Sequence, residues 1–309
     1  MNGGIKEEFS NAWSKPNNAV VQIIIINVVI FLILLLLQIF LPASIFEEIH
    51  KHFVIPPLFD RFIFRPYTIM TYGFTHSLTG IFHILFNMYV FYIFGRLINE
   101  YLGSNKVLSL YVLGAIGGGI LYLLAYNLIP TYNNSATNTL LNQPDWGMVG
   151  ASAAVYAVVV AAATKMPNYT FHLLLFGPVR IKYIAFFVIV LSLVGINANS
   201  NFGGNVAHLG GALVGWIYIS QLNKGTDIGS WVISFIQFVK SMFKPQPKIK
   251  VTHRSGSRRP SAKKAGKNTT EAGKTPQAEI DAILDKISEK GYESLSKDEK
   301  QKLFNASKK

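Results

Sequence analysis

The sequence contains no cysteine, and only 15% of its 309 residues are charged. The lack of cysteine excludes disulfide bonds, thiol nucleophiles and cysteine-ligated metal sites. Soluble chains carry roughly 25% charged residues. A charge content this low, beside 50% hydrophobic residues, excludes a soluble protein of ordinary composition.

Positive charge is scarce over most of the chain and concentrated at its end. Residues 1–223 hold 10 Lys+Arg and 7 Asp+Glu, a net charge of +3, whereas residues 224–309 hold 19 and 9, a net charge of +10. This asymmetry excludes a uniformly basic nucleic-acid-binding protein. We therefore expect no nucleic-acid partner.

The apolar residues are gathered into runs that are long enough to cross a membrane. A spanning helix needs about 20 mostly apolar residues, and residues 19–41 form an uncharged run that we interpret as a retained first span rather than a signal peptide. The later runs are rich in Gly, Ala and Ser, which favours close helix packing. The predicted fold is an all-α polytopic membrane protein with six spans, at residues 19–41, 79–98, 106–127, 148–165, 180–198 and 204–222.

Basic residues in the short loops predict the orientation, because Lys and Arg are enriched on the cytoplasmic side. With residues 1–18 in the cytoplasm, seven basic residues lie inside and three outside before the tail is counted. The inside set is Lys6, Lys15, Arg96, Lys106, Lys165, Arg180 and Lys182, and the outside set is Lys51, Arg61 and Arg65. Both termini are therefore expected in the cytoplasm.

The segments outside the spans have patterns of their own. Residues 42–78 mix aromatic and charged side chains, so much of this outer loop is expected in the membrane interface. Residues 223–243 are predicted to form an amphipathic helix in the inner interface, with a seventh span as the alternative. Residues 244–275 form a basic, disordered linker that either binds anionic lipids or is a solvated tether. Residues 276–309 are predicted to form a helical hairpin, whose partner is unknown.

Polar side chains inside spans are costly and usually have a function. Four stand out: His83 and Asn87 in the second span, Ser152 in the fourth and His208 in the sixth. These spans run in one direction, and His83, Ser152 and His208 each lie about four residues from the outer end, roughly 6 Å below the boundary. Topology therefore predicts that the four residues meet near the outer side.

Ser152 and His208 are the candidates for a nucleophile and its general base. An isolated helical serine most often bonds to its own backbone, and an isolated intramembrane histidine is most often a packed hydrogen-bonding group. Here the small residues around Ser152 and the glycines Gly211 and Gly215 allow the fourth and sixth spans to pack closely. Their matched depth favours a Ser-His dyad. Asp145, in the preceding loop, is the nearest acid for a triad, but its position does not require that role.

His83 and Asn87 are spaced i, i+4 and so share one face of their helix. With the backbone N–H of Ser152, they could donate hydrogen bonds to an oxyanion. A polar contact between helices or metal ligation is the alternative. Two histidines without an intramembrane carboxylate make a poor zinc site, so neither a metal nor another cofactor is expected.

Three motifs together resemble the rhomboid family of intramembrane serine proteases. They are HILFNMYVFYIFGRLINEYLGS at residues 83–104, GASAA at residues 150–154 and AHLGG at residues 207–211, and the resemblance covers roughly residues 19–222. It implies a catalytic serine at Ser152, its histidine at His208, oxyanion donors at His83 and Asn87, a stacking tyrosine at Tyr156, and supporting glycines at Gly150, Gly211 and Gly215. It also implies cleavage of transmembrane protein substrates near their outer ends, in contact with membrane lipids and without a cofactor.

The sequence departs from the family pattern at two places. Ala153 follows the serine where glycine is usual and is expected to crowd the oxyanion side, and residues 65–67 read Arg-Pro-Tyr where a tryptophan is common. The tail resembles an extension found on some bacterial rhomboids, which favours a bacterial inner membrane. A non-catalytic rhomboid-like protein that binds membrane-protein clients is the alternative function. A transporter is less favoured, because no inverted repeat is found.

Overall fold

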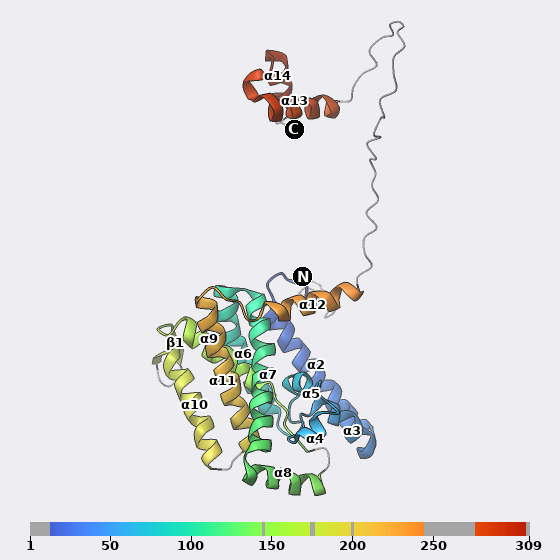
Figure 1. The fold of residues 1–309 in the computed structure, drawn as a ribbon, viewed down its shortest axis with the longest axis vertical. Coiled ribbons are helices and arrows are strands. Elements are labelled where there is room, and N and C mark those ends of the chain that lie inside the picture. Colours follow the sequence, from blue (N-terminus) through green and yellow to red (C-terminus); the bar gives the residue numbers. More distant parts are fainter. Residues whose placement is uncertain (1–12, 144–145, 174–176, 199–200, 244–275, 307–309) are drawn as a thin grey trace, which may run out of the picture. The chain divides into compact units, whose positions relative to one another are not determined.

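Helices make up most of the chain in the computed structural model, which describes residues 13–143, 146–173, 177–198, 201–243 and 276–306 (Figure 1). The chain divides into two units, residues 1–247 and residues 248–309, which we describe separately. The first unit is a helical bundle that contains every residue of the candidate site.

Six helices of the first unit lie where the sequence predicts spans. They are α2 (Ala19–Phe40), α6 (Ile81–Leu102), α7 (Ser104–Leu128), α9 (Ser152–Lys165), α10 (Ile181–Asn197) and α11 (Phe202–Asn223). By length and apolar composition α2, α6 and α7 can each cross a membrane, and α9 and α10 are shorter apolar helices. The chain is therefore an integral membrane protein, and the number of six spans stays a prediction.

Small residues place α9 at the centre of the bundle, where it packs against α6, α7, α10 and α11 (Figure 1). Its Ala and Val side chains are buried around almost the whole helix. A methyl group at Gly211 or Gly215 of α11 would overlap the carbonyl oxygen of Ala153 or Ala157 on α9, respectively. The two backbones therefore lie in direct contact, which only glycine permits at these positions.

The segment at residues 42–78, which is expected on the outer side, consists of short helical elements rather than linker. They are α3 (Ala43–His50), η1 (Lys51–Phe53), α4 (Phe59–Phe62), α5 (Thr68–Thr71) and η2 (Tyr72–Phe74). Ile63 and Phe64 are 71% and 82% exposed, whereas Tyr72 is buried against α7 and donates a hydrogen bond to the carbonyl of Ala115. Exposed apolar residues on one part of the loop and buried ones on another fit the expected interfacial position.

Two segments that lie between predicted spans contain regular structure. Residues 130–142 form α8 (Pro130–Asn142), which begins with a proline at its first position. Between α9 and α10, β1 (Thr170–Leu173) and β2 (Gly177–Arg180) pair as an antiparallel hairpin with Phe171 opposite Val179. The prediction of an all-α fold is corrected by this hairpin, whose strands are too short for a clear alternating pattern.

The helix after the bundle, α12 (Ser230–Phe243), has a polar and an apolar side. It has 14 residues, as many as α9, so it is about 21 Å long at 1.5 Å per residue. In Figure 1 it lies across the end of the bundle rather than along it. Its exposed Trp231, Phe235, Phe238 and Met242 would enter a membrane interface in that position.

A hydrogen-bonded turn holds the start of α12 against the bundle. Lys106 of α7 forms an ion pair with Asp227, which also accepts hydrogen bonds from the hydroxyl of Tyr218 and the backbone N–H of Gly229. Ser109 donates to the carbonyl of Gly229 at 2.9 Å. The position of α12 is therefore fixed by α7 and α11.

The second unit is a small hairpin of α13 (Pro276–Lys290), η3 (Tyr292–Ser294) and α14 (Lys297–Ala306). Gly291 ends α13 with a φ of +76°, a conformation that favours glycine. Ser296 and Glu299 exchange hydrogen bonds between side chain and backbone, which forms the capping box of α14. The predicted linker at residues 244–275 lies outside the described residues.

Candidate active site

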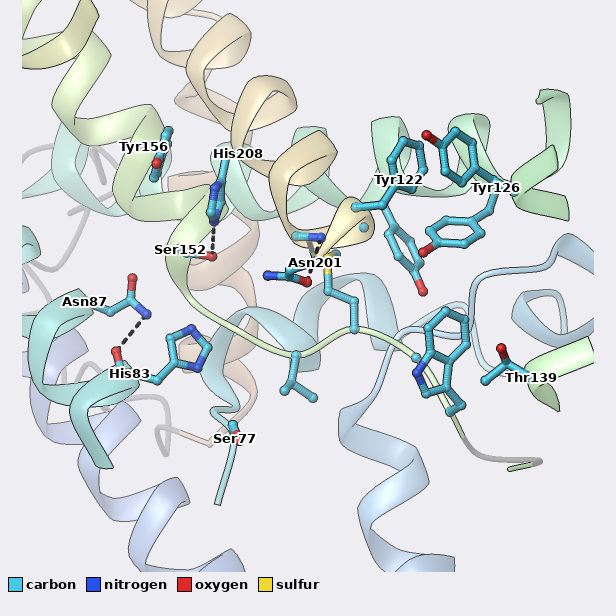
Figure 2. A pocket seen from close by; sticks show the side chains of 18 of the residues that line it. Ser77, His83, Asn87, Tyr122, Tyr126, Thr139, Ser152, Tyr156, Asn201 and His208 are labelled. Atoms are coloured by element: carbon cyan, nitrogen blue, oxygen red, sulfur yellow. Dashed lines mark hydrogen bonds between the residues drawn. The ribbon is translucent and has the colours of Figure 1, made fainter. Parts of the chain in front are cut away.

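Ser152 and His208 lie side by side although 55 residues separate them in the sequence. The Oγ atom of Ser152 is 2.9 Å from Nε2 of His208 (Figure 2). Ser152 is the first residue of α9, and His208 is about two turns into α11. The contact between α9 and α11 at Gly211 and Gly215 therefore brings the two side chains together.

The start of α9 differs from the predicted fourth span, which was expected to begin at residue 148 and to place Ser152 about four residues from its outer end. Instead, Met148 pairs with Ile55 through two backbone hydrogen bonds, and the N–H of Gly150 donates to the carbonyl of Tyr72. Gly150 has a φ of +139°, which side chains of other residues rarely tolerate. This extended segment ends at Ala151 and presents Ser152 at the open end of the helix.

Tyr156 lies flat against the imidazole of His208. The two ring centroids are 4.2 Å apart and the ring planes differ by 11°. Tyr156 is one turn after Ser152 on α9, so one helix supplies both the hydroxyl beside the histidine and the ring that covers its face. This stacking restricts rotation of the imidazole.

His83 and Asn87 face the same cavity from α6, opposite Ser152 (Figure 2). The side-chain amide of Asn87 donates one hydrogen bond, at 2.9 Å, to the carbonyl of His83. An amide group has two N–H donors, so this bond leaves a second one. The imidazole of His83 packs edge-on against His76, with ring centroids 5.3 Å apart.

Ala153, which was expected to crowd the oxyanion side, has its methyl group against α7 instead. Its Cβ atom occupies the space that a side chain at Gly118 would need. The absence of a side chain at Gly118 therefore accommodates the larger residue after Ser152. The expectation that Ala153 crowds the oxyanion side is therefore corrected.

The dyad opens into a cavity of about 880 Å³. Its described lining contains no Asp, Glu, Lys or Arg, and one end is rich in aromatic side chains. These rings come from α7, α8, the segment before α9 and the start of α11, and they are Tyr122, Tyr126, Tyr132, Trp146 and Phe202. Hydropathy does not predict this end of the cavity, because it does not show that α7, α8, the segment before α9 and the start of α11 meet there. The i, i+4 spacing of Tyr122 and Tyr126 is the only hint in the sequence.

A second missed residue is Ser192 of α10. Its Oγ atom is 3.2 Å from Nδ1 of His208, on the side of the ring away from Ser152. Asp145, the acid considered for a triad, lies outside the described residues.

Comparison with known proteins gives two family matches and several curated relatives. A family model described as the rhomboid domain matches residues 64–224, and a family of unknown function matches residues 269–309. RHOMBOID-like protein 12, mitochondrial, from Arabidopsis thaliana is 33% identical over 163 residues, which are 52% of this chain and 48% of that protein. Rhomboid-like protein 16, chloroplastic, from the same plant is 29% identical over 167 residues, covering 52% and 50%.

Presenilin-associated rhomboid-like protein A, mitochondrial, from Danio rerio is 28% identical over 147 residues, which are 45% of this chain and 34% of that protein. The chain therefore spans half or less of the length of these curated relatives. The two helices that carry the dyad, α9 and α11, both lie within residues 64–224 of the domain match.

Proposed function

The chain belongs to the rhomboid family, and on that premise we propose that it is a serine endopeptidase that hydrolyses peptide bonds in or near the transmembrane segments of membrane proteins. The observation that carries the proposal is the 2.9 Å contact between Oγ of Ser152 and Nε2 of His208. A serine hydroxyl becomes an effective nucleophile when a general base lies within hydrogen-bond reach. This contact provides that base.

In the proposed reaction Nε2 of His208 takes the proton of Ser152 as Oγ attacks the carbonyl carbon of the scissile peptide. The tetrahedral intermediate collapses when His208 gives that proton to the leaving nitrogen, which breaks the C–N bond and leaves an ester on Ser152. Water then attacks the ester, again with His208 as the base. His208 then returns the proton to Oγ of Ser152, so the ester bond breaks, a carboxylic acid is released and the hydroxyl is restored.

The negative charge on the tetrahedral oxygen needs donors that are already in place. We assign this role to the backbone N–H of Ser152, the ring of His83 and the second amide N–H of Asn87. Because Ser152 is the first residue of α9, its N–H has no partner within the helix, and it lies at the positive end of the helix dipole. The oxyanion would therefore form where the backbone already favours negative charge.

The substrate class follows from the cavity and from the chemistry of helices. An uncharged, aromatic lining favours apolar segments over charged ones. A helical peptide bond resists attack, because its carbonyl is hydrogen-bonded and covered by side chains. We therefore expect substrates with Gly, Pro or other helix-weakening residues near the scissile bond.

We also propose that both termini lie on the inner side of the membrane and that the cavity opens to the outer side. The basis is the excess of Lys and Arg in the loops assigned to the inner side and in the tail. The proposal of a bacterial inner membrane rests on the short loops and the tail of this sequence, whereas the named relatives are mitochondrial or chloroplastic. Membrane lipids are the expected surroundings of α2 and α10, whose outer faces are exposed and apolar.

Cleavage of a fluorogenic transmembrane peptide by the full-length chain in detergent tests the proposal. Ser152→Ala should abolish cleavage, because it removes the nucleophile. Ser135→Ala removes another hydroxyl from the same cavity and should leave cleavage close to wild type. Cleavage that survives Ser152→Ala would contradict the proposal. A wild-type chain that binds the peptide without cleaving it would support the alternative of a non-catalytic client-binding protein.

A further inference from the structure

The catalytic histidine of the proposed mechanism has a third neighbour that the dyad does not use. Ser192 is 1% exposed on α10, and its Oγ atom lies 3.2 Å from Nδ1 of His208. We propose that Ser192 is a positioning residue: it accepts a hydrogen bond from Nδ1–H and so holds His208 in the tautomer that leaves Nε2 free to act as the base. This inference rests on the proposed function.

The hydrogen-bonding capacity of the groups supports this direction. A neutral imidazole carries one proton, so Nε2 can accept the proton of Ser152 only when Nδ1 holds the N–H. The hydroxyl of Ser192 has one hydrogen and two lone pairs. Its other neighbours are the carbonyl of Val188 at 3.2 Å, which can only accept, and the hydroxyl of Tyr156 at 3.3 Å. When the Ser192 hydrogen is given to either group, a lone pair of Oγ remains for His208.

Ser192 and Tyr156 fix the imidazole in two different ways. Tyr156 covers the face of the ring, and its hydroxyl donates to the same carbonyl of Val188 at 3.3 Å. Ser192 contacts the edge of the ring at Nδ1. The face contact limits tilting, and the edge contact decides which nitrogen carries the proton. Only the second determines whether Nε2 is a base.

A hydroxyl suits this position better than a carboxylate would. A charged side chain inside a membrane helix carries a large free-energy cost. A neutral hydroxyl avoids that cost, and its hydrogen bond to Nδ1–H strengthens when His208 becomes positively charged during proton transfer. The site therefore gains the orienting contact of a triad without a buried acid.

The alternative is that Ser192 only bonds to its own helix. Serine side chains in helices often donate to the carbonyl four residues earlier, and Ser192 makes this contact with Val188. A purely structural serine would affect stability but not the protonation site of His208. The test must therefore read the tautomer and the chemical step, and not only the total activity.

The experiment compares Ser192→Ala, Ser192→Thr and the control Ser109→Ala in the full-length chain in detergent. Ser109 matches Ser192 as a buried helical serine, 1% exposed, that donates to a backbone carbonyl away from the dyad. The ¹⁵N NMR spectrum of histidine-labelled protein reports which nitrogen of His208 is protonated, and steady-state cleavage of the transmembrane peptide gives kcat and KM. His208→Asn identifies the His208 signals.

For Ser192→Ala we expect mixed tautomers in place of the Nδ1–H form and a kcat reduced about tenfold, which corresponds to about 1.4 kcal/mol, with KM unchanged. Ser192→Thr keeps a hydroxyl, so its His208 tautomer and its kcat should match the wild type. Ser109→Ala should change neither the tautomer nor kcat. If Ser192→Ala does not accumulate as folded protein, Ser192→Cys, with a weak acceptor of similar size, replaces it with the same expectation.

The inference is overturned if the loss of the hydroxyl leaves the tautomer and kcat as in the wild type, or if Ser109→Ala produces an equal loss. It is also overturned if the wild type holds its proton on Nε2. Failure of the proposed function looks different: the wild-type chain would not cleave at all, while the NMR spectrum would still show whether Ser192 holds Nδ1–H.

Discussion

Gly211→Ala is the substitution that tests most directly how the contact between α9 and α11 forms the site. The added methyl group would overlap the carbonyl oxygen of Ala153, the residue next to Ser152. Unbonded heavy atoms pack at roughly 3.5 Å, so the helices would have to move apart by roughly 1.5 Å at this point to remove the overlap. Such a shift would lengthen the 2.9 Å contact between Ser152 and His208.

The energetic balance of Gly211→Ala contains two opposing terms. Replacing glycine inside a helix favours the helix by about 1 kcal/mol, whereas overpacking a close contact costs about 1–3 kcal/mol. We expect a net change in unfolding free energy of about 0–2 kcal/mol, because these two ranges partly cancel. Activity should fall much further, by about 100-fold, because a displacement of this size misplaces reacting groups.

Cleavage of the transmembrane peptide and thermal unfolding, measured on the same preparations, check this prediction. Gly95→Ala is the matched control: Gly95 also lies inside a bundle helix, but a methyl group there would meet a side-chain carbon of Val20 at 3.3 Å rather than a carbonyl. It should keep nearly full activity. If Gly211→Ala cleaved as fast as Gly95→Ala, the backbone contact would not be what positions the dyad.

Three further predictions concern parts of the chain away from the dyad. Tyr111→Phe should destabilise the bundle by about 1–3 kcal/mol, because Asn27 and the carbonyl of Gly73 lose a buried hydroxyl partner; thermal unfolding measures this, and the exposed Tyr183→Phe should show no change. Hydrogen bonds from Lys286 and the backbone of Ser296 lower the pKa of Glu299 to about 2, so the contribution of Glu299 to hairpin stability is complete above its ordinary pKa and is lost as the pH falls toward 2; amide exchange in α13 and α14 should show this, and Glu299→Gln should remove the dependence. Truncation after Pro247 should leave cleavage in detergent intact, because all candidate site residues belong to the first unit; complete loss would show that the tail helps to build the bundle.

The positions of the main helices could be predicted because they follow from local composition. Mostly apolar runs of sufficient length indicate α2, α6 and α7, and the structure has helices at those places. Shared depth on parallel helices was enough to bring Ser152 and His208 together as candidates. These inferences require only helix geometry and the cost of polar groups in a membrane.

What the sequence could not supply depends on contacts between distant segments. The start of α9 at Ser152, rather than four residues earlier, follows from the pairing of Met148 with Ile55 and from the positive φ of Gly150. The aromatic end of the cavity forms because α7, α8, the segment before α9 and the start of α11 each bring aromatic side chains to it. Ser192 sits in an ordinary apolar helix, and nothing nearby in the sequence distinguishes it from a serine that bonds only to its own backbone.

The central claim is that Ser152 is a nucleophile activated by His208, and covalent labelling tests it most directly. The full-length chain in detergent is treated with a fluorophosphonate, and the modified peptide is identified by mass spectrometry. The account predicts one adduct on Ser152, absent from His208→Asn and from Ser152→Ala and retained in Ser135→Ala. A folded wild-type chain that carries no adduct on Ser152, or that is labelled equally well without His208, would contradict it.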